Sequence, residues 1–242
     1  MCVPENSTDP IPWKPAPLPR PVTLSGRYAM LEPLDAALHA ADLWSGVEGH
    51  DEVWRWLPDG PYGSEAALRQ ALEEKQTALN AFFLAILSET NGRAEGYASY
   101  MRIDSANGVI EVGNILLAPS MQRTTAATEA MYLMAKHVFE DLGYRRYEWK
   151  CNTKNEPSMR AALRLGFSYE GIFRQHMVVK GENRDTAWYS MLDSEWPARK
   201  MAFEAWLDPA NFDDEGRQRK SLGQLHSSVA WFFNQSGSGS QR

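Results

Sequence analysis

The sequence has few cysteines, no long apolar run and no excess of positive charge, and each shortage excludes a class of protein. Two cysteines among 242 residues are too few for a disulfide framework or a zinc cage. The longest apolar run, residues 81–87, is far shorter than the roughly 20 residues of a membrane-spanning helix. The first ten residues lack a cationic start and an apolar core, so we expect no secretory signal and a cytoplasmic protein.

Charge and histidine spacing exclude two further classes. There are 31 acidic and 25 basic side chains, and the net charge of -6 argues against general binding to nucleic acid. The five histidines show no metal-ligand spacing, so we expect no metal site. The 43% hydrophobic fraction is typical of a soluble folded protein, and we expect a monomer or a homodimer.

Composition divides the chain into three parts. Residues 1–25 hold seven of the 14 prolines and read as a proline-rich arm. Residues 26–222 carry the periodic patterns of one folded domain. Residues 223–242 end in serine and glycine and read as a flexible tail. The aromatic run 229–233 could dock on a partner, although an unstructured tail is the favoured interpretation.

The first half of the domain predicts an antiparallel meander. A strand over 27–34 and an amphipathic helix starting after Ser64 precede it. Three β-rich runs follow, separated by Asn-Gly pairs that favour tight hairpin turns. These runs span 82–88, 94–103 and 109–117.

The second half predicts a crossover between parallel strands. A helical pattern over about 125–142 leads to a strand over 144–151, which should therefore lie parallel to the strand at 109–117. A short helix over 156–165 follows, and then two strands paired through a turn at Gly181. The prediction is an α+β fold with a mixed, mostly antiparallel sheet flanked by helices.

Four short motifs occur in a fixed order along this second half. They are Glu111-Val112-Gly113, the loop residues 122–130, Asn155 with Ser158, and Leu165-Gly166-Phe167 with Glu170-Gly171. The ordered set resembles the GNAT superfamily of N-acyltransferases, and within it the RimJ/RimL branch that acetylates the amino termini of ribosomal proteins. The resemblance covers residues 25–195 and implies a sheet that splays at its central parallel pair of strands.

The resemblance implies an acetyl-CoA-dependent N-acetyltransferase. The acetyl group would pass directly to a primary amine, on a protein N-terminus or a small molecule, in a ternary complex. Met177 stands where the branch has a carboxylate, and Ala162 stands where many superfamily members have a tyrosine acid. These departures keep open an alternative, a non-catalytic module that binds acyl-CoA as a sensor or partner subunit.

The loop at 122–128 has the chemistry of a phosphate site. Helix N-termini offer unpaired N–H groups and a positive dipole end to anions, and Arg123 adds a cation. The family has glycine where this chain has Arg123 and Thr125, so we expect both side chains to point away from the ligand. A threonine-capped helix without a ligand is the alternative. The residues expected to contact coenzyme A are Ile115, Leu116, Leu117, Gln122, Arg123, Thr124, Thr125, Ala126, Ala127, Thr128, Asn155 and Ser158.

Acetyl transfer to an amine needs a base for the ammonium proton and an acid for the departing thiolate. Ser158 matches the proposed acid of the branch, although a serine there can also cap a helix. Glu111 and His176 are the candidate bases, and a structural role for either is equally open. Asp185 also matches a family position, although a turn at 183–185 would account for it.

The acceptor site is expected between the first strand and the helix after Ser64. Trp54, Trp56 and Tyr62 form an aromatic group there, and Asp51 and Glu52 could attract a cationic amine. A core cluster is the alternative interpretation of these aromatic side chains.

Overall fold

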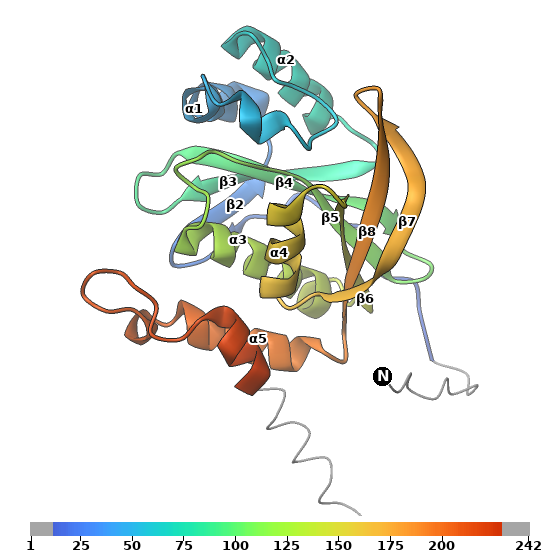
Figure 1. Ribbon diagram of the computed structural model, residues 1–242, viewed down its shortest axis with the longest axis vertical. Coiled ribbons are helices and arrows are strands. Elements are labelled where there is room, and N and C mark those ends of the chain that lie inside the picture. Colours follow the sequence, from blue (N-terminus) through green and yellow to red (C-terminus); the bar gives the residue numbers. More distant parts are fainter. Residues whose placement is uncertain (1–11, 229–242) are drawn as a thin grey trace, which may run out of the picture.

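An eight-stranded sheet organises residues 12–228, the part of the chain that the computed structural model describes (Figure 1). The strands lie in the order β1-β2-β3-β4-β5-β6-β8-β7. Their bounds are β1 Leu24–Ser25, β2 Ala29–Pro33, β3 Ala81–Ser88, β4 Ala94–Asp104, β5 Val109–Leu117, β6 Arg146–Asn152, β7 Ser168–Val179 and β8 Glu182–Leu192.

The predicted meander and the predicted parallel pair are both confirmed. Neighbours from β1 to β5 pair antiparallel, while β5 and β6 pair parallel, with Val109 opposite Arg146. Gly92 and Gly108 of the Asn-Gly turns adopt φ of 68° and 64°, left-handed values that glycine tolerates without strain.

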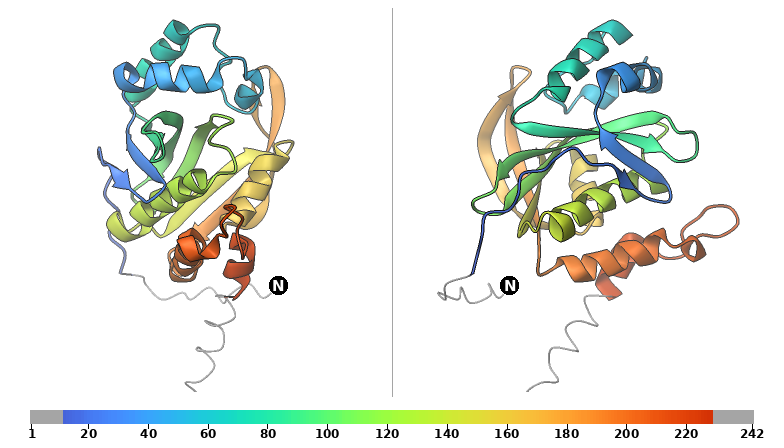
Figure 2. Two further views of the ribbon diagram at one scale, coloured as in Figure 1. Left: turned by 90° about the vertical axis from the view of Figure 1, so that its left-hand side faces the viewer. Right: turned by 180° about the vertical axis from the view of Figure 1, so that it is seen from behind.

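Helices cover the two faces of the sheet unequally (Figure 2). On one face, α3, α4 and α5 pack against most of the strands. On the other face, α1 and α2 pack on β2, β3 and β4 and on the end of β5. Within residues 12–228 no helix is long and apolar enough to cross a membrane. The helical segments are α1 Ala36–Val47, η1 Asp51–Trp54, α2 Glu65–Gln76, α3 Thr125–Lys136, η2 His137–Asp141, α4 Glu156–Arg164, α5 Trp196–Leu207 and η3 Pro209–Asn211.

Two predicted boundaries are corrected by the structure. The helix expected to reach 142 ends its α-helical part at Lys136 and continues as the π-helical η2, because Leu142 N bonds the His137 carbonyl. Residues 183–185 lie inside β8 and not in a turn. The turn is Lys180-Gly181, with φ of 50° and 79°, as a two-residue type I′ hairpin requires.

Both ends of the described chain pack on the domain. The Trp13 indole donates to the Ala106 carbonyl at 2.7 Å, and Ala16 is buried. Residues 222–228 are helical, and Leu222 and His226 are buried, so the folded part continues past the predicted boundary at 222. The aromatic run 229–233 lies outside the described residues.

Buried His226 predicts an acid-sensitive fold. Burial first, and then Arg199 and Arg164, lower its pKa to about 4, whereas an unfolded histidine titrates near 6.5. The unfolded chain therefore takes up the proton first as the pH falls. As far as His226 is concerned, the free energy of unfolding is highest above about pH 6.5. It decreases as the pH falls toward 4, by about 3 kcal/mol at most. Urea denaturation at pH 7 and pH 4.5 measures this loss.

His226→Leu should flatten this pH dependence, and His50→Leu, at an exposed site, should leave it unchanged. An unaltered pH slope in the His226→Leu protein would contradict the assignment.

Candidate active site

The central feature of the site is the point where β5 and β6 part. Their parallel register ends at Val112 opposite Trp149, so the rest of β5 turns unpaired backbone groups toward β6. A bulge on β5 accompanies the parting. Between the pairs Ser99–Gly113 and Tyr97–Leu116, β5 has two residues where β4 has one. Asn114, at φ 51°, is one of these two residues. A Cβ at Gly113 would lie 2.4 Å from Met101 Sδ, so a larger residue there would displace the Met101 side chain.

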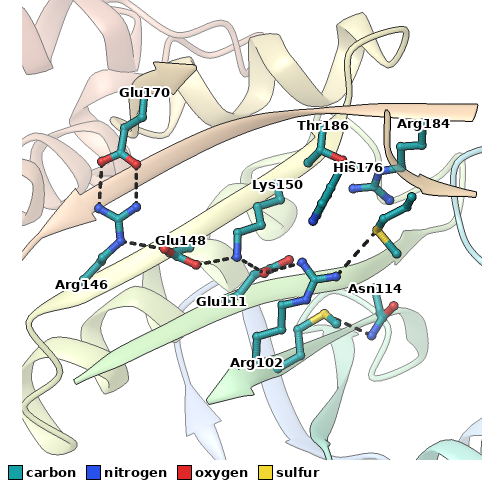
Figure 3. A network of polar contacts seen from close by, with 12 residues as sticks. Arg102, Glu111, Asn114, Arg146, Glu148, Lys150, Glu170, His176, Arg184 and Thr186 are labelled. Atoms are coloured by element: carbon teal, nitrogen blue, oxygen red, sulfur yellow. Dashed lines mark hydrogen bonds and ion pairs between the residues drawn. The ribbon is translucent and has the colours of Figure 1, made fainter. Parts of the chain in front are cut away.

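Bulges occur on three strands of the sheet, β4, β5 and β7. Arg102 on β4 has φ 46° and Gln175 on β7 has φ 49°, and both lie where the strand register shifts. Asn114 supplies the third. Left-handed backbone at a residue other than glycine is costly and concentrates at functional sites, where bulges re-aim side chains. Here the bulges turn Arg102 and His176 toward one region of the sheet (Figure 3).

The loop before α3 has the backbone of a phosphate-binding helix start. Thr124 caps α3 by accepting from Ala127 N at 3.0 Å. The N–H groups of Thr125 and Ala126 find no acceptor within residues 12–228. Arg123 has φ 62°, a left-handed conformation that glycine adopts most readily, so the loop takes this turn with a residue other than glycine.

The start of α4 lies beside the freed end of β6. Asn155 caps the helix by accepting from Ser158 N at 3.2 Å. The Trp149 indole donates to Ser158 Oγ at 3.0 Å. The cap is therefore the Asn155 side chain, and the half-buried Ser158 hydroxyl can still donate its own hydrogen, with the Cys151 sulfur as one acceptor nearby.

The buried side chain of Lys150 reaches from β6 to an acidic residue of β5 on the same face of the sheet. Lys150 Nζ lies 2.8 Å from Glu111 Oε2 and 2.6 Å from Glu148 Oε2. It also lies 3.8 Å from the centre of the Trp188 ring, a cation–π distance. Arg102 contacts the same Glu111 Oε2 at 3.3 Å. Two cations therefore share one oxygen of Glu111, which is the arrangement of a structural ion pair.

The ion pairs continue away from the parting point (Figure 3). Arg146 Nε donates to Glu148 at 2.7 Å, and its two terminal nitrogens contact Glu170 at 2.8 and 2.5 Å. Acidic and basic side chains thus alternate along the part of the sheet face that α1 and α2 do not cover. The order is Glu170, Arg146, Glu148, Lys150, Glu111 and Arg102.

His176 has the surroundings of a neutral base. Its Nδ1 lies 3.0 Å from Thr186 Oγ1, and its Nε2 has no partner within the described residues. Burial first, and then Arg102 and Arg184, lower the pKa of His176, so the ring is neutral near pH 7. Asp185 accepts from Gln175 N at 2.7 Å and thereby holds the bulge that orients the histidine.

One of the three aromatic residues expected to bind the acceptor, Trp54, is part of the core, while Trp56 and Tyr62 are half-buried. Trp54 is 2% exposed and packs edge-on against Tyr62 at 5.1 Å, so the core interpretation holds for Trp54. Trp56 is half-buried beside the Arg55 guanidinium. Lys180 at the β7–β8 turn donates to the Trp54 carbonyl at 2.9 Å. The hairpin and η1 therefore meet beside the uncovered face.

The sequence analysis did not single out Arg102, Lys150, Arg184 and Thr186. Alternation along β6, with Glu148 and Lys150 flanking buried Trp149, was the available signal for Lys150. No comparable signal marks Arg102, because a bulge on β4 decides where it points, whereas Arg184 follows the ordinary alternation of side chains along β8. Among residues 12–228 no three histidine, cysteine or acidic side chains are grouped to hold a metal ion.

Comparison with known proteins agrees with this geometry. The family model described as an acetyltransferase (GNAT) domain matches residues 29–168. A GCN5-related N-acetyltransferase structure from Brucella melitensis has a TM-score of 0.87 and 48% identity, over 89% of this chain and 99% of that one. The uncharacterized N-acetyltransferase p20 of Bacillus licheniformis is 30% identical, over 66% of this chain and 90% of its own.

A third relative has a named substrate. The ribosomal-protein-serine acetyltransferase of Escherichia coli is 30% identical over 41% of this chain and 56% of its own length. The family model covers more than half of the 242 residues, and the parted strands of the sheet agree with it. The chain therefore belongs to the GNAT family of acetyltransferases, and it is an acyltransferase.

Proposed function

We propose that the protein uses acetyl-CoA to acetylate a primary amine, by direct transfer in a ternary complex. The parting of β5 and β6 is the main support for this proposal. It opens the sheet between the N-terminal end of α3, which Thr124 caps, and the face of the sheet on which His176 lies. The names of the relatives favour an enzyme over a binding module. The ribosomal relative supports a protein N-terminus as acceptor, and a small amine fits the same chemistry. The proposed location is the cytoplasm.

The described residues fit coenzyme A at two places. The free N–H groups of Thr125 and Ala126 suit the pyrophosphate, and Thr124 and Arg123 complete that turn. The unpaired edge of β5 at residues 115–117 suits the amides of the pantetheine arm, which can pair as an added strand does. When bound, acetyl-CoA supplies the acetyl thioester.

The chain supplies the proton transfers. We assign His176 as the base because it is neutral and its Nε2 is unpartnered among the described residues, whereas Glu111 is held between two cations. We assign Ser158 as the acid for the thiolate, because its hydrogen is not used by the Trp149 contact. Burial raises the pKa of the Cys151 thiol, which disfavours a thiolate nucleophile and supports direct transfer.

Acetyl-CoA should stabilise the protein against heat, and Thr125→Pro should weaken that effect. Ligand at a hundred times its Kd adds about 2.7 kcal/mol to the stability. Thr125 is the first residue of α3, where proline fits the helix but removes one donor to the phosphates. Thermal-shift titration measures both proteins.

Glu65→Pro is the matched control, since Glu65 is the first residue of α2 and Ser64 is as extended as Thr124. Equal titrations for the Thr125→Pro and Glu65→Pro proteins would place the pyrophosphate elsewhere.

Ser158→Ala should lower kcat on the order of 100-fold and leave the KM for acetyl-CoA nearly unchanged. The physical reason is that an acid acts on the thiolate only as the thioester breaks. Steady-state thiol release gives both constants, and thermal denaturation checks the fold. A variant with full turnover would remove Ser158 from the mechanism.

His176→Gln should lower kcat/KM on the order of 100-fold and abolish the acid limb of its pH profile. A base works only when it is deprotonated, so activity in the wild type falls as the pH drops below the lowered pKa of His176. Arg102→Gln removes a neighbouring positive charge, raises that pKa and moves the limb to higher pH. An unchanged acid limb in His176→Gln would assign the base to another group.

A further inference from the structure

Arg184 is a cation without a counterion among the described residues. Its half-buried side chain donates from Nε to Thr186 Oγ1 at 3.1 Å. No carboxylate of residues 12–228 lies within 4.0 Å of its guanidinium. Arg102, Arg146 and Lys150 on the same face each contact at least one. Arg184 is therefore the exception on this face.

The neighbouring ion pairs are balanced among themselves. The chain from Glu170 to Arg102 alternates three acids with three bases, so it is neutral without Arg184. Burial lowers the pKa of Arg184 and Arg102 adds to that effect, while Cys151 and Glu111 oppose it without an ion-pair contact. A cation removed from water is costly unless an anion accompanies it. Arg184 therefore lacks a direct anionic partner among the described residues.

The position of this charge links it to the proposed chemistry. The guanidinium of Arg184 and the ring of His176 contact the same atom, Thr186 Oγ1, at 3.1 and 3.0 Å (Figure 3). Arg184 Nε is used in this contact, while its two terminal nitrogens have no partner within the described residues. A planar guanidinium with free terminal nitrogens is suited to a carboxylate or a phosphate.

We propose that the acceptor is an amine that carries an anionic group, a carboxylate or a phosphate, and that Arg184 binds this group. The inference rests on the proposed function, since it names the substrate class of the same site. The anion on Arg184 places the amine beside His176. The sequence analysis expected a cationic amine drawn by Asp51 and Glu52, but both are exposed, and Glu52 already pairs with His50 at 3.2 Å.

Calorimetry on the CoA-loaded protein tests the inference without requiring turnover. The probes are matched pairs, an amino acid with its amide and phosphoethanolamine with ethanolamine. We expect the anionic member of one pair to bind about 10- to 100-fold more tightly than its uncharged partner, as a charge-assisted contact predicts. The pair that shows this preference tells whether the anionic group is a carboxylate or a phosphate. Equal or weaker binding of both anionic members overturns the inference. Tighter binding of an anionic amine without release of thiol from acetyl-CoA would uphold this inference but contradict the proposed function.

Arg184→Gln assigns the effect to the residue. For the preferred anionic amine, KM should rise about 10- to 100-fold with kcat nearly unchanged, while its uncharged partner is unaffected. Arg184→Lys keeps the charge and should recover part of the loss, and Arg217→Gln, 70% exposed and paired with Asp213, is the control. An equal fall in kcat for both members would mean that Arg184 stabilises the tetrahedral oxyanion, and would overturn the proposal.

Thermal denaturation checks that each variant folds. If Arg184→Gln does not fold, Arg184→Lys decides the matter, because a partial loss of discrimination between the paired amines supports the anion contact. Unchanged discrimination in the Arg184→Lys protein overturns it.

Discussion

The site depends on the loss of hydrogen bonding between β5 and β6 beyond Val112. Two parallel strands that start in register do not separate without a cause, and here the cause lies on β5. The extra residue at Asn114 bends that strand away. The parted strands leave backbone groups that a ligand can use, and they bring the starts of α3 and α4 to the same opening.

The two faces of the opened sheet are built differently. On the face of α3 and α4 the polar groups are backbone N–H groups and hydroxyls, which suit a long ligand with phosphates at one end. On the opposite face they are charged side chains fixed by mutual ion pairs. Such a chain is rigid because each charged group is held by a neighbour, so the residues at its end keep their positions without a ligand.

Local patterns predicted the elements of the fold but not the side-chain arrangement of the site. The Asn-Gly turns, the crossover helix and the loop at 122–128 are each encoded within a few residues, so the sequence indicated them. The left-handed backbone of Arg102 and Gln175 arises at register shifts between β4 and β5 and between β7 and β8, which no local residue pattern marks. The same holds for the neutrality of His226, which depends on burial against α5. At Arg123 a residue other than glycine adopts left-handed backbone, which its identity alone did not indicate.

The two-residue turn at Lys180-Gly181 sets the register of the whole β7–β8 hairpin. Side chains alternate between faces with a period of two, so one inserted or deleted residue would exchange the faces of every later position on the strand. Arg184 and Thr186 would then point away from His176. Lys180 would also lose its place at the Trp54 carbonyl. Natural length variation among relatives should therefore be excluded from this turn and better tolerated at Asn91-Gly92, an exposed turn.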